Sequence, residues 1–177
     1  LTALSIGSDE RILQFSNISF DASVEQLWLA FLSGSTLVGI DSKTIFDIDR
    51  MHNLVNKLGI THLDLVPSYY RELNLEDLNV LRRVISGGET CPISVANKLI
   101  TKNFYNEYGL TETTVTSIRA FVKNRFVEAE RVPIGKPISN TQVYILNPWN
   151  NLQPIGIFGE LCISGDGLAI GYLNNPE

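Results

Sequence analysis

Apolar and polar residues alternate along the first two thirds of the chain in a pattern that predicts short strands separated by amphipathic helices. The pattern predicts strands at residues 11–16, 37–40, 61–66, 84–85 and 103–106. Helices are expected at residues 22–32, 47–58 and 92–100. Strands and helices that follow one another in this way are typical of an α/β fold built on a sheet.

Two of the predicted helices carry an apolar stripe of the kind that normally faces a protein core. In the first helix the stripe comprises Val24, Leu27, Trp28, Phe31 and Leu32, and Gly34 ends the helix. In the second it comprises Ile48, Met51, Leu54, Val55 and Leu58, with Asp47 as the expected N-cap.

The pattern changes after about residue 119, where helical periodicity fades and prolines and glycines become more frequent. Short alternating strands are expected at residues 142–146 and 160–163. A boundary near residues 124–131 would divide the chain into an α/β part, residues 1–124, and a β-rich part, residues 125–177.

The composition of the chain excludes some classes of function. The 177 residues are 44% hydrophobic and 19% charged, with a net charge of −5, which is ordinary for a globular enzyme. No cluster of Lys and Arg favours nucleic acid as a partner, and no apolar run approaches the ~18 residues that a membrane span needs. Cys91 and Cys162 lack metal-ligand spacing, which favours a reduced, cytoplasmic protein. The absence of an initiator methionine or signal peptide suggests an internal fragment of a longer polypeptide.

Chemically useful side chains follow the predicted strands, and open α/β sheets bind ligands at the carboxyl ends of their strands. Residues 106–114 are the richest such stretch. Tyr108 offers a flat face to a base, Gly109 allows close approach of a ligand, Thr111 can donate to a phosphate, and Glu112 is an oxygen ligand suited to Mg²⁺. The alternative is a structural turn with a packed tyrosine and an N-capping threonine.

Four stretches, in order, resemble the motifs of adenylation domains of nonribosomal peptide synthetases, which are adenylate-forming enzymes. They are residues 20–24 (FDASV), 85–89 (ISGGE), 106–112 (NEYGLTE) and 159–173 (GELCISGDGLAIGYL). The resemblance implies part of that family's N-terminal core: a flavodoxin-like α/β sheet followed by part of a distorted β-barrel.

The same resemblance implies ATP and Mg²⁺ as cofactors and formation of an aminoacyl-adenylate with release of pyrophosphate. Its implied nucleotide contacts are Tyr108 on adenine, Thr111 on the α-phosphate, Glu112 on Mg²⁺, and Gly87, Gly88, Glu89, Asn106 and Gly109 around the base. The implied partners are a carrier protein bearing phosphopantetheine and the condensation domains of the same assembly line.

For the amino acid, the resemblance implies that Asp21 pairs with the α-ammonium group, whereas local sequence also fits a helix N-cap. The implied side-chain pocket comprises Ala22, Glu25, Asp64, Ile85, Gly87, Glu107, Val115 and Thr116. Its three acidic residues favour a basic substrate, lysine or ornithine first, then arginine, with glutamine or glutamate open. The alternative is that Glu25 and Glu107 simply face water.

Departures from the family pattern leave other hypotheses open. The family's pyrophosphate-gripping loop, ribose-binding aspartate and C-terminal catalytic lysine are missing, so the 177 residues alone are expected to be inactive. Leu110 replaces the usual proline and Ile170 the usual arginine. An acyl- or aryl-acid ligase that uses coenzyme A, and a non-catalytic remnant of the fold, are the alternatives.

Overall fold

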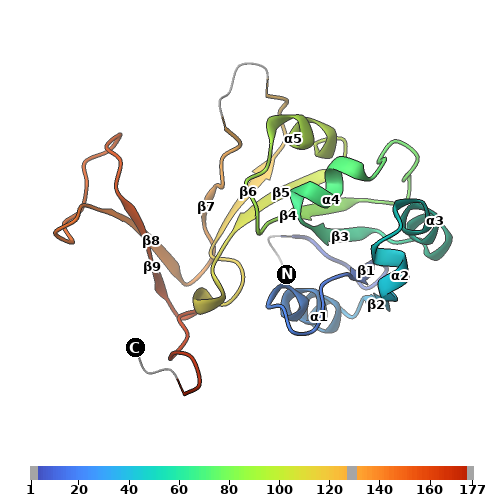
Figure 1. The fold of residues 1–177 in the computed structure, drawn as a ribbon, viewed down its shortest axis with the longest axis horizontal. Coiled ribbons are helices and arrows are strands. Elements are labelled where there is room, and N and C mark those ends of the chain that lie inside the picture. The colour runs from blue at the N-terminus through green and yellow to red at the C-terminus, as the bar shows by residue number, and fades with distance from the viewer. Residues whose placement is uncertain (1–3, 127–130, 175–177) are drawn as a thin grey trace.

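The computed structural model describes residues 4–126 and 131–174, in which a seven-stranded sheet forms the centre (Figure 1). Its strand order is β2-β1-β3-β4-β5-β6-β7. The first five in that order run parallel: β2 (Thr36–Gly39), β1 (Arg11–Gln14), β3 (His62–Leu65), β4 (Arg83–Ser86) and β5 (Asn103–Tyr108). The antiparallel strands β6 (Ile118–Val122) and β7 (Lys136–Pro137) extend one edge.

Helices cover both faces of the sheet (Figure 1). They are α1 (Ala22–Ser33), α2 (Ser42–Ile45), α3 (Ile48–Leu58), α4 (Pro67–Glu72) and α5 (Ile93–Leu99), and a short 3-10 turn, η1 (Thr111–Thr113), follows β5. The prediction of an α/β fold is therefore confirmed. The short helices α2 and α4 and the strands β6 and β7 were not predicted.

Two apolar clusters bury the faces of the sheet. On one face, α3, α4 and α5 pack on the strands through buried residues that include Met51, Tyr70, Val95, Leu63 and Phe104. On the other face, α1 packs on the sheet through a smaller cluster that comprises Leu4, Ile12, Leu29, Ala30, Ile85 and Tyr105. The α3 stripe was predicted correctly, since Met51 and Val55 are fully buried and Asp47 caps the helix.

The predicted core face of α1 is wrong. Val24, Trp28, Phe31 and Leu32 are exposed, Phe31 by 66%, and the helix instead buries Ser23, Gln26, Leu29 and Ala30. The small side chains of Ser23 and Ala30 let the helix approach the sheet closely, and Gln26 is buried because it has hydrogen-bond partners there. Hydrophobic periodicity cannot register a polar side chain that is buried through such bonds.

Gln26 ties α1 to the end of β1. Its Oε1 accepts from the backbone N–H groups of Phe15 and Ser16, at 3.0 and 3.1 Å, and its Nε2 donates to the Asp64 carbonyl at 3.2 Å. Phe15, Ser16 and Asp64 all line the pocket described below. One buried amide therefore links α1 to the segment after β1 and to strand β3 at the site.

We predict that Gln26→Leu lowers the free energy of unfolding by about 2–4 kcal/mol, because it leaves two backbone N–H groups without an acceptor. Urea unfolding measures the change. The matched control is Gln14→Leu, which removes a single bond to the Ser16 carbonyl and should cost about 1 kcal/mol. Equal losses in the two variants would contradict the assigned role of Gln26.

The C-terminal part forms a separate two-stranded antiparallel sheet, β8 (Thr141–Leu146) with β9 (Glu160–Gly165), which projects away from the main sheet (Figure 1). Of the predicted boundary, residues 127–130 lie outside the described residues. Since β7 still pairs with β6, the separate ladder begins at Thr141, and a division at residue 124 stays a proposal. In the described residues, no helix has the length and apolar character to cross a membrane.

Candidate active site

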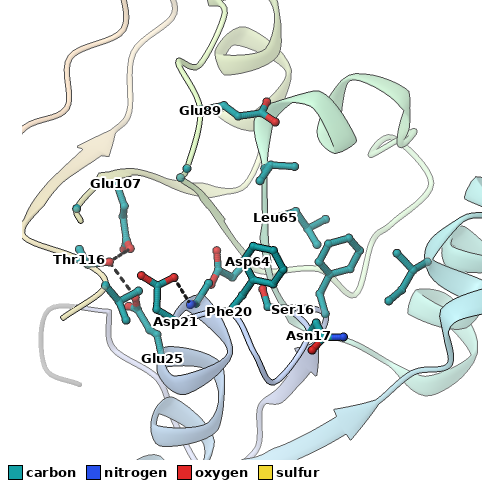
Figure 2. A pocket seen from close by; sticks show the side chains of 18 of the residues that line it. Ser16, Asn17, Phe20, Asp21, Glu25, Asp64, Leu65, Glu89, Glu107 and Thr116 are labelled. Atoms are coloured by element: carbon teal, nitrogen blue, oxygen red, sulfur yellow. Dashed lines mark hydrogen bonds between the residues drawn. The ribbon is translucent and has the colours of Figure 1, made fainter. Parts of the chain in front are cut away.

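A pocket of about 620 Å³ opens at the carboxyl ends of the parallel strands (Figure 2). The strand order reverses direction between β1 and β3, and ligands of open α/β sheets bind at such a switch point. The predicted site residues in its walls are Asp21, Ala22, Glu25, Asp64, Gly87, Gly88, Glu89, Glu107, Tyr108, Gly109, Val115 and Thr116. These residues come from loops and elements far apart in sequence, and the fold brings them together.

Four predicted site residues lie outside the walls formed by the described residues. Ile85 is buried in the α1-side core, 1% exposed, and Asn106 is buried with its side-chain amide donating to the Pro133 carbonyl at 3.0 Å. Thr111 and Glu112 are exposed on η1. Ile85 therefore belongs to the core and does not line the pocket, contrary to the prediction. The roles proposed for Asn106, Thr111 and Glu112 remain predictions.

The sequence interpretation missed an apolar section of the wall. This section includes Phe15, Phe20, Ile45, Phe46, Leu65 and Val66. Phe15 and Tyr69 pack edge to face, with ring centroids 4.9 Å apart, and Tyr69 donates to the Ile45 carbonyl at 3.0 Å. Ile45 and Tyr69 lie on α2 and α4, which were not predicted. Phe15, Leu65 and Val66 lie in predicted strands, but the sequence did not indicate that their side chains face the pocket.

Asp21 fills the N-cap role and makes a second contact through its other carboxylate oxygen. One carboxylate oxygen caps α1 by accepting from the Ala22 N–H at 2.8 Å. The other accepts from the Thr111 hydroxyl at 2.6 Å. The residue predicted to hold an α-ammonium group therefore contacts the residue predicted to meet a phosphate, and the first of them, Asp21, lines the pocket.

An acidic cluster forms the inner wall, where Glu25 and Glu107 approach each other across Thr116 (Figure 2). The Thr116 hydroxyl lies 2.8 Å from Glu25 and 2.7 Å from Glu107. Neither glutamate faces water, since Glu107 is 7% exposed and the Glu25 side chain 14%. The alternative of two solvent-facing carboxylates is therefore wrong.

Arg119 is the functional residue that sequence reasoning missed. Its Nη2 donates to Glu25 at 2.9 Å, and its Nε donates to Glu107. Arg119 stands directly opposite Glu107 in the antiparallel β5–β6 register. A cross-strand charge pair could have signalled this contact, but only if β6 had been predicted.

Burial and crowding change the protonation of the acidic residues. The enclosed position of Asp64, together with the charges of Glu25 and Glu107, raises the pKa of Asp64 well above its usual range. Burial and then Glu25 raise the pKa of Glu107 to about 7, although Arg119 and Thr116 oppose the shift. The pocket therefore carries less negative charge near neutral pH than three ionised carboxylates would give.

The protein's own backbone leaves no room for a side chain at Gly109. A Cβ atom at this position would lie 1.7 Å from the Val115 carbonyl oxygen, so the close approach is to the protein's own backbone. Thr114 and Val115 follow with φ of 60° and 66°, a left-handed conformation that β-branched residues rarely adopt. The strained turn at Thr114 and Val115 brings the Thr116 hydroxyl into contact with Glu25 and Glu107.

The C-terminal motif lies against η1. The Tyr172 hydroxyl donates to Glu112 Oε1 at 2.8 Å, and the Ala169 N–H donates to the Glu112 carbonyl at 2.8 Å. A backbone N–H and then Tyr172 lower the pKa of Glu112, which keeps this exposed carboxylate ionised. Across residues 4–126 and 131–174, no three His, Cys, Asp or Glu side chains gather as a metal cluster. One ionised carboxylate nonetheless fits Mg²⁺, which typically takes one or two from a protein beside substrate phosphates and water.

The fold agrees with the comparisons with known proteins. The model of the AMP-binding enzyme family matches residues 2–173, and the chain belongs to that family. It is 39% identical over 176 residues to gramicidin S synthase 1 of Brevibacillus brevis, covering 99% of this chain and 16% of the synthase. The adenylate-forming family predicted from the four motifs is confirmed.

Solved structures give the same result. The nonribosomal peptide synthetase FmoA3 in an AMPPNP-bound form superposes with a TM-score of 0.93 at 26% identity, over 99% of this chain and 20% of that one. The four-domain synthetase holo-AB3403, bound to AMP and glycine, gives 0.86 at 30% identity, over 99% and 13%. The chain spans 16% or less of the length of the first curated relatives it matches.

Proposed function

We propose that these residues form the amino-acid and nucleotide pocket of an adenylation domain in a longer polypeptide, which activates an amino acid with ATP for nonribosomal peptide synthesis. The observation that carries the proposal is the hydrogen bond between Asp21 and Thr111. It joins an anionic anchor for an α-ammonium group to the turn expected to meet the α-phosphate. An amino acid held at Asp21 would have its carboxylate close to that phosphate.

The reaction needs no nucleophile from the protein. One oxygen of the substrate carboxylate attacks the α-phosphorus of ATP, the bond from that phosphorus to the bridging oxygen breaks, and pyrophosphate leaves with the electron pair. The products are an aminoacyl-adenylate and pyrophosphate. The protein contributes by positioning both substrates and by stabilising charge, which together account for most catalysis of this type.

We infer that Tyr108 stacks on adenine, with Gly87, Gly88, Glu89, Asn106 and Gly109 around it, and that Thr111 contacts the α-phosphate. Glu112, held by Tyr172, is the residue that would hold Mg²⁺. Bound Mg²⁺ would neutralise charge on the phosphates. A carrier protein with phosphopantetheine, neighbouring condensation domains and a cytoplasmic location, which the free cysteines favour, belong to the same proposal.

For the side chain we propose lysine or ornithine. Glu25, Asp64 and Glu107 all line the inner wall, and a substrate ammonium group would compensate their charge. Amino-acid-dependent ATP–pyrophosphate exchange by the full polypeptide tests the proposal across lysine, ornithine, arginine, glutamine, glutamate and neutral amino acids. Lysine or ornithine is expected to give the highest kcat/KM. Preference for an aliphatic amino acid would keep the reaction and reject the basic substrate.

The second candidate is an acyl- or aryl-acid ligase of the same superfamily. Leu110 favours it, because leucine stands where the resemblance to amino-acid-activating domains leads one to expect proline. Exchange with fatty or aromatic acids, and none with amino acids, would select this candidate. Residues 1–177 by themselves are expected to show no exchange with either class of substrate.

A further inference from the structure

Arg119 lies behind the pocket and touches it only through other residues. It projects from β6, its side chain is 16% exposed, and it is absent from the pocket walls that the described residues form. Nε and Nη2 of its guanidinium bond one oxygen each of Glu107 and Glu25. Two side chains from β5 and α1 are thus held side by side by one planar cation.

This contact changes the charge that the pocket presents. Burial, together with the charges of Glu25 and Glu107, raises the pKa of Asp64 well above its usual range. Glu25 and Glu107 face a single guanidinium, so that the charges of these two glutamates and Arg119 sum to −1 when both glutamates are ionised. A substrate side chain with one positive charge would bring the sum to zero.

The hydrogen bonds of Thr116 also indicate that the cluster has one negative charge to neutralise. The Thr116 hydroxyl has one hydrogen but lies within hydrogen-bond distance of Glu25 Oε2 and Glu107 Oε2, at 2.8 and 2.7 Å. The second of these contacts needs another proton. A protonated Glu107 supplies it by donating to Thr116, which then donates to Glu25. Without a substrate cation, the cluster is therefore built to retain one proton.

We infer that Arg119 is a positioning residue for substrate selection, because it aligns Glu25 and Glu107 and cancels one of their charges, so that the pocket takes an amino-acid side chain bearing a single positive charge. This inference rests on the proposed function and adds a residue and a mechanism to it. The substrate ammonium replaces the retained proton, so that binding of a cationic side chain and deprotonation of Glu107 are coupled.

The charged and titratable groups around Glu107 come from each neighbouring element. They are Glu25 on α1, Asp64 on β3 and Arg119 on β6, with Tyr105 on β5 acting on Arg119. His62 on β3 lies near Arg119, and burial lowers its pKa to about 3, so it stays neutral in the tested range. The pKa of Glu107 is raised to about 7 by burial and by the charge of Glu25.

The test is the pH dependence of KM for ornithine in ATP–pyrophosphate exchange by the full polypeptide. As pH rises through about 7, Glu107 loses its proton, the pocket gains a negative charge, and KM should fall. KM for glutamine, which is uncharged, should change little. Arg119→Met removes the cation beside Glu107, so the midpoint for ornithine should move upward by ~1 pH unit or more.

Matched variants separate charge from structure. Arg119→Lys keeps the charge, and its midpoint should stay near that of the unchanged protein. Arg119→Gln keeps hydrogen-bond donors without the charge and replaces Arg119→Met if that variant does not fold. If the variants catalyse exchange with ornithine and the pH midpoint of KM is the same in all of them, the inference is overturned and the proposed function stays intact. No exchange with any amino acid would overturn both.

Discussion

Asp21→Asn is expected to reduce kcat/KM for the amino acid by about 100- to 1,000-fold in ATP–pyrophosphate exchange, which corresponds to about 3–4 kcal/mol. Asparagine removes the negative charge that would pair with the α-ammonium group. It keeps the N-cap of α1, because asparagine caps helices as well as aspartate does, so the fold should not change. KM for ATP should stay within about threefold, since the loss falls on the amino acid.

Asp47→Asn provides the matched control. Asp47 caps α3 by accepting from the Arg50 N–H at 3.0 Å, and it lies outside the pocket walls that the described residues form. This variant should keep full activity. If Asp21→Asn were as active as Asp47→Asn, Asp21 would be a structural cap alone, and the observation that carries the proposed function would lose its meaning.

Gly109→Ala is expected to lower the free energy of unfolding by about 3 kcal/mol or more, because the new Cβ would lie 1.7 Å from the Val115 carbonyl oxygen. The atoms that this Cβ would meet belong to the backbone of Val115 and Thr116, which cannot rotate away as a flexible side chain can. The clash can be relieved only if the strained turn at Thr114 and Val115 moves, and Thr116 would move with it. Urea unfolding measures the stability, and amino-acid KM should rise in whatever fraction folds.

Gly39→Ala is the control for this substitution. Gly39 ends β2, and a Cβ atom there would meet nothing within 4 Å of the described structure. Its stability should change by less than about 1 kcal/mol. Similar small losses in both variants would show that the turn after β5 can widen freely, which would contradict the fixed geometry described for Thr116.

The local sequence was sufficient to predict those helices and strands whose structure depends mainly on their own residues. The 3.6-residue spacing of Met51 and Val55, together with Asp47 and Gly59 at the ends, defines α3. The strands that carry Asp64 and Glu107, and the strand that leads to Gly87, were also found, because each is a short buried run that ends at a loop. These elements place much of the pocket at one edge of the sheet, as expected.

The remainder depends on contacts between distant segments. Gln26 is buried because Phe15 and Ser16 need an acceptor, and no pattern within α1 reports that need. Arg119 enters the site because β6 turns back beside β5 and places it opposite Glu107. The sequence count of three acids was correct, but the guanidinium that offsets one of them became visible only in the folded chain.

The most direct measurement compares ATP–pyrophosphate exchange supported by lysine with exchange supported by 6-aminohexanoic acid, using the full polypeptide that carries these residues. The two acids share the carboxylate and the terminal ammonium group, and they differ in the α-ammonium group that Asp21 is proposed to bind. Exchange with lysine and little or none with 6-aminohexanoic acid is the expected result. Equal exchange with both would contradict an amino-acid-activating site anchored at Asp21.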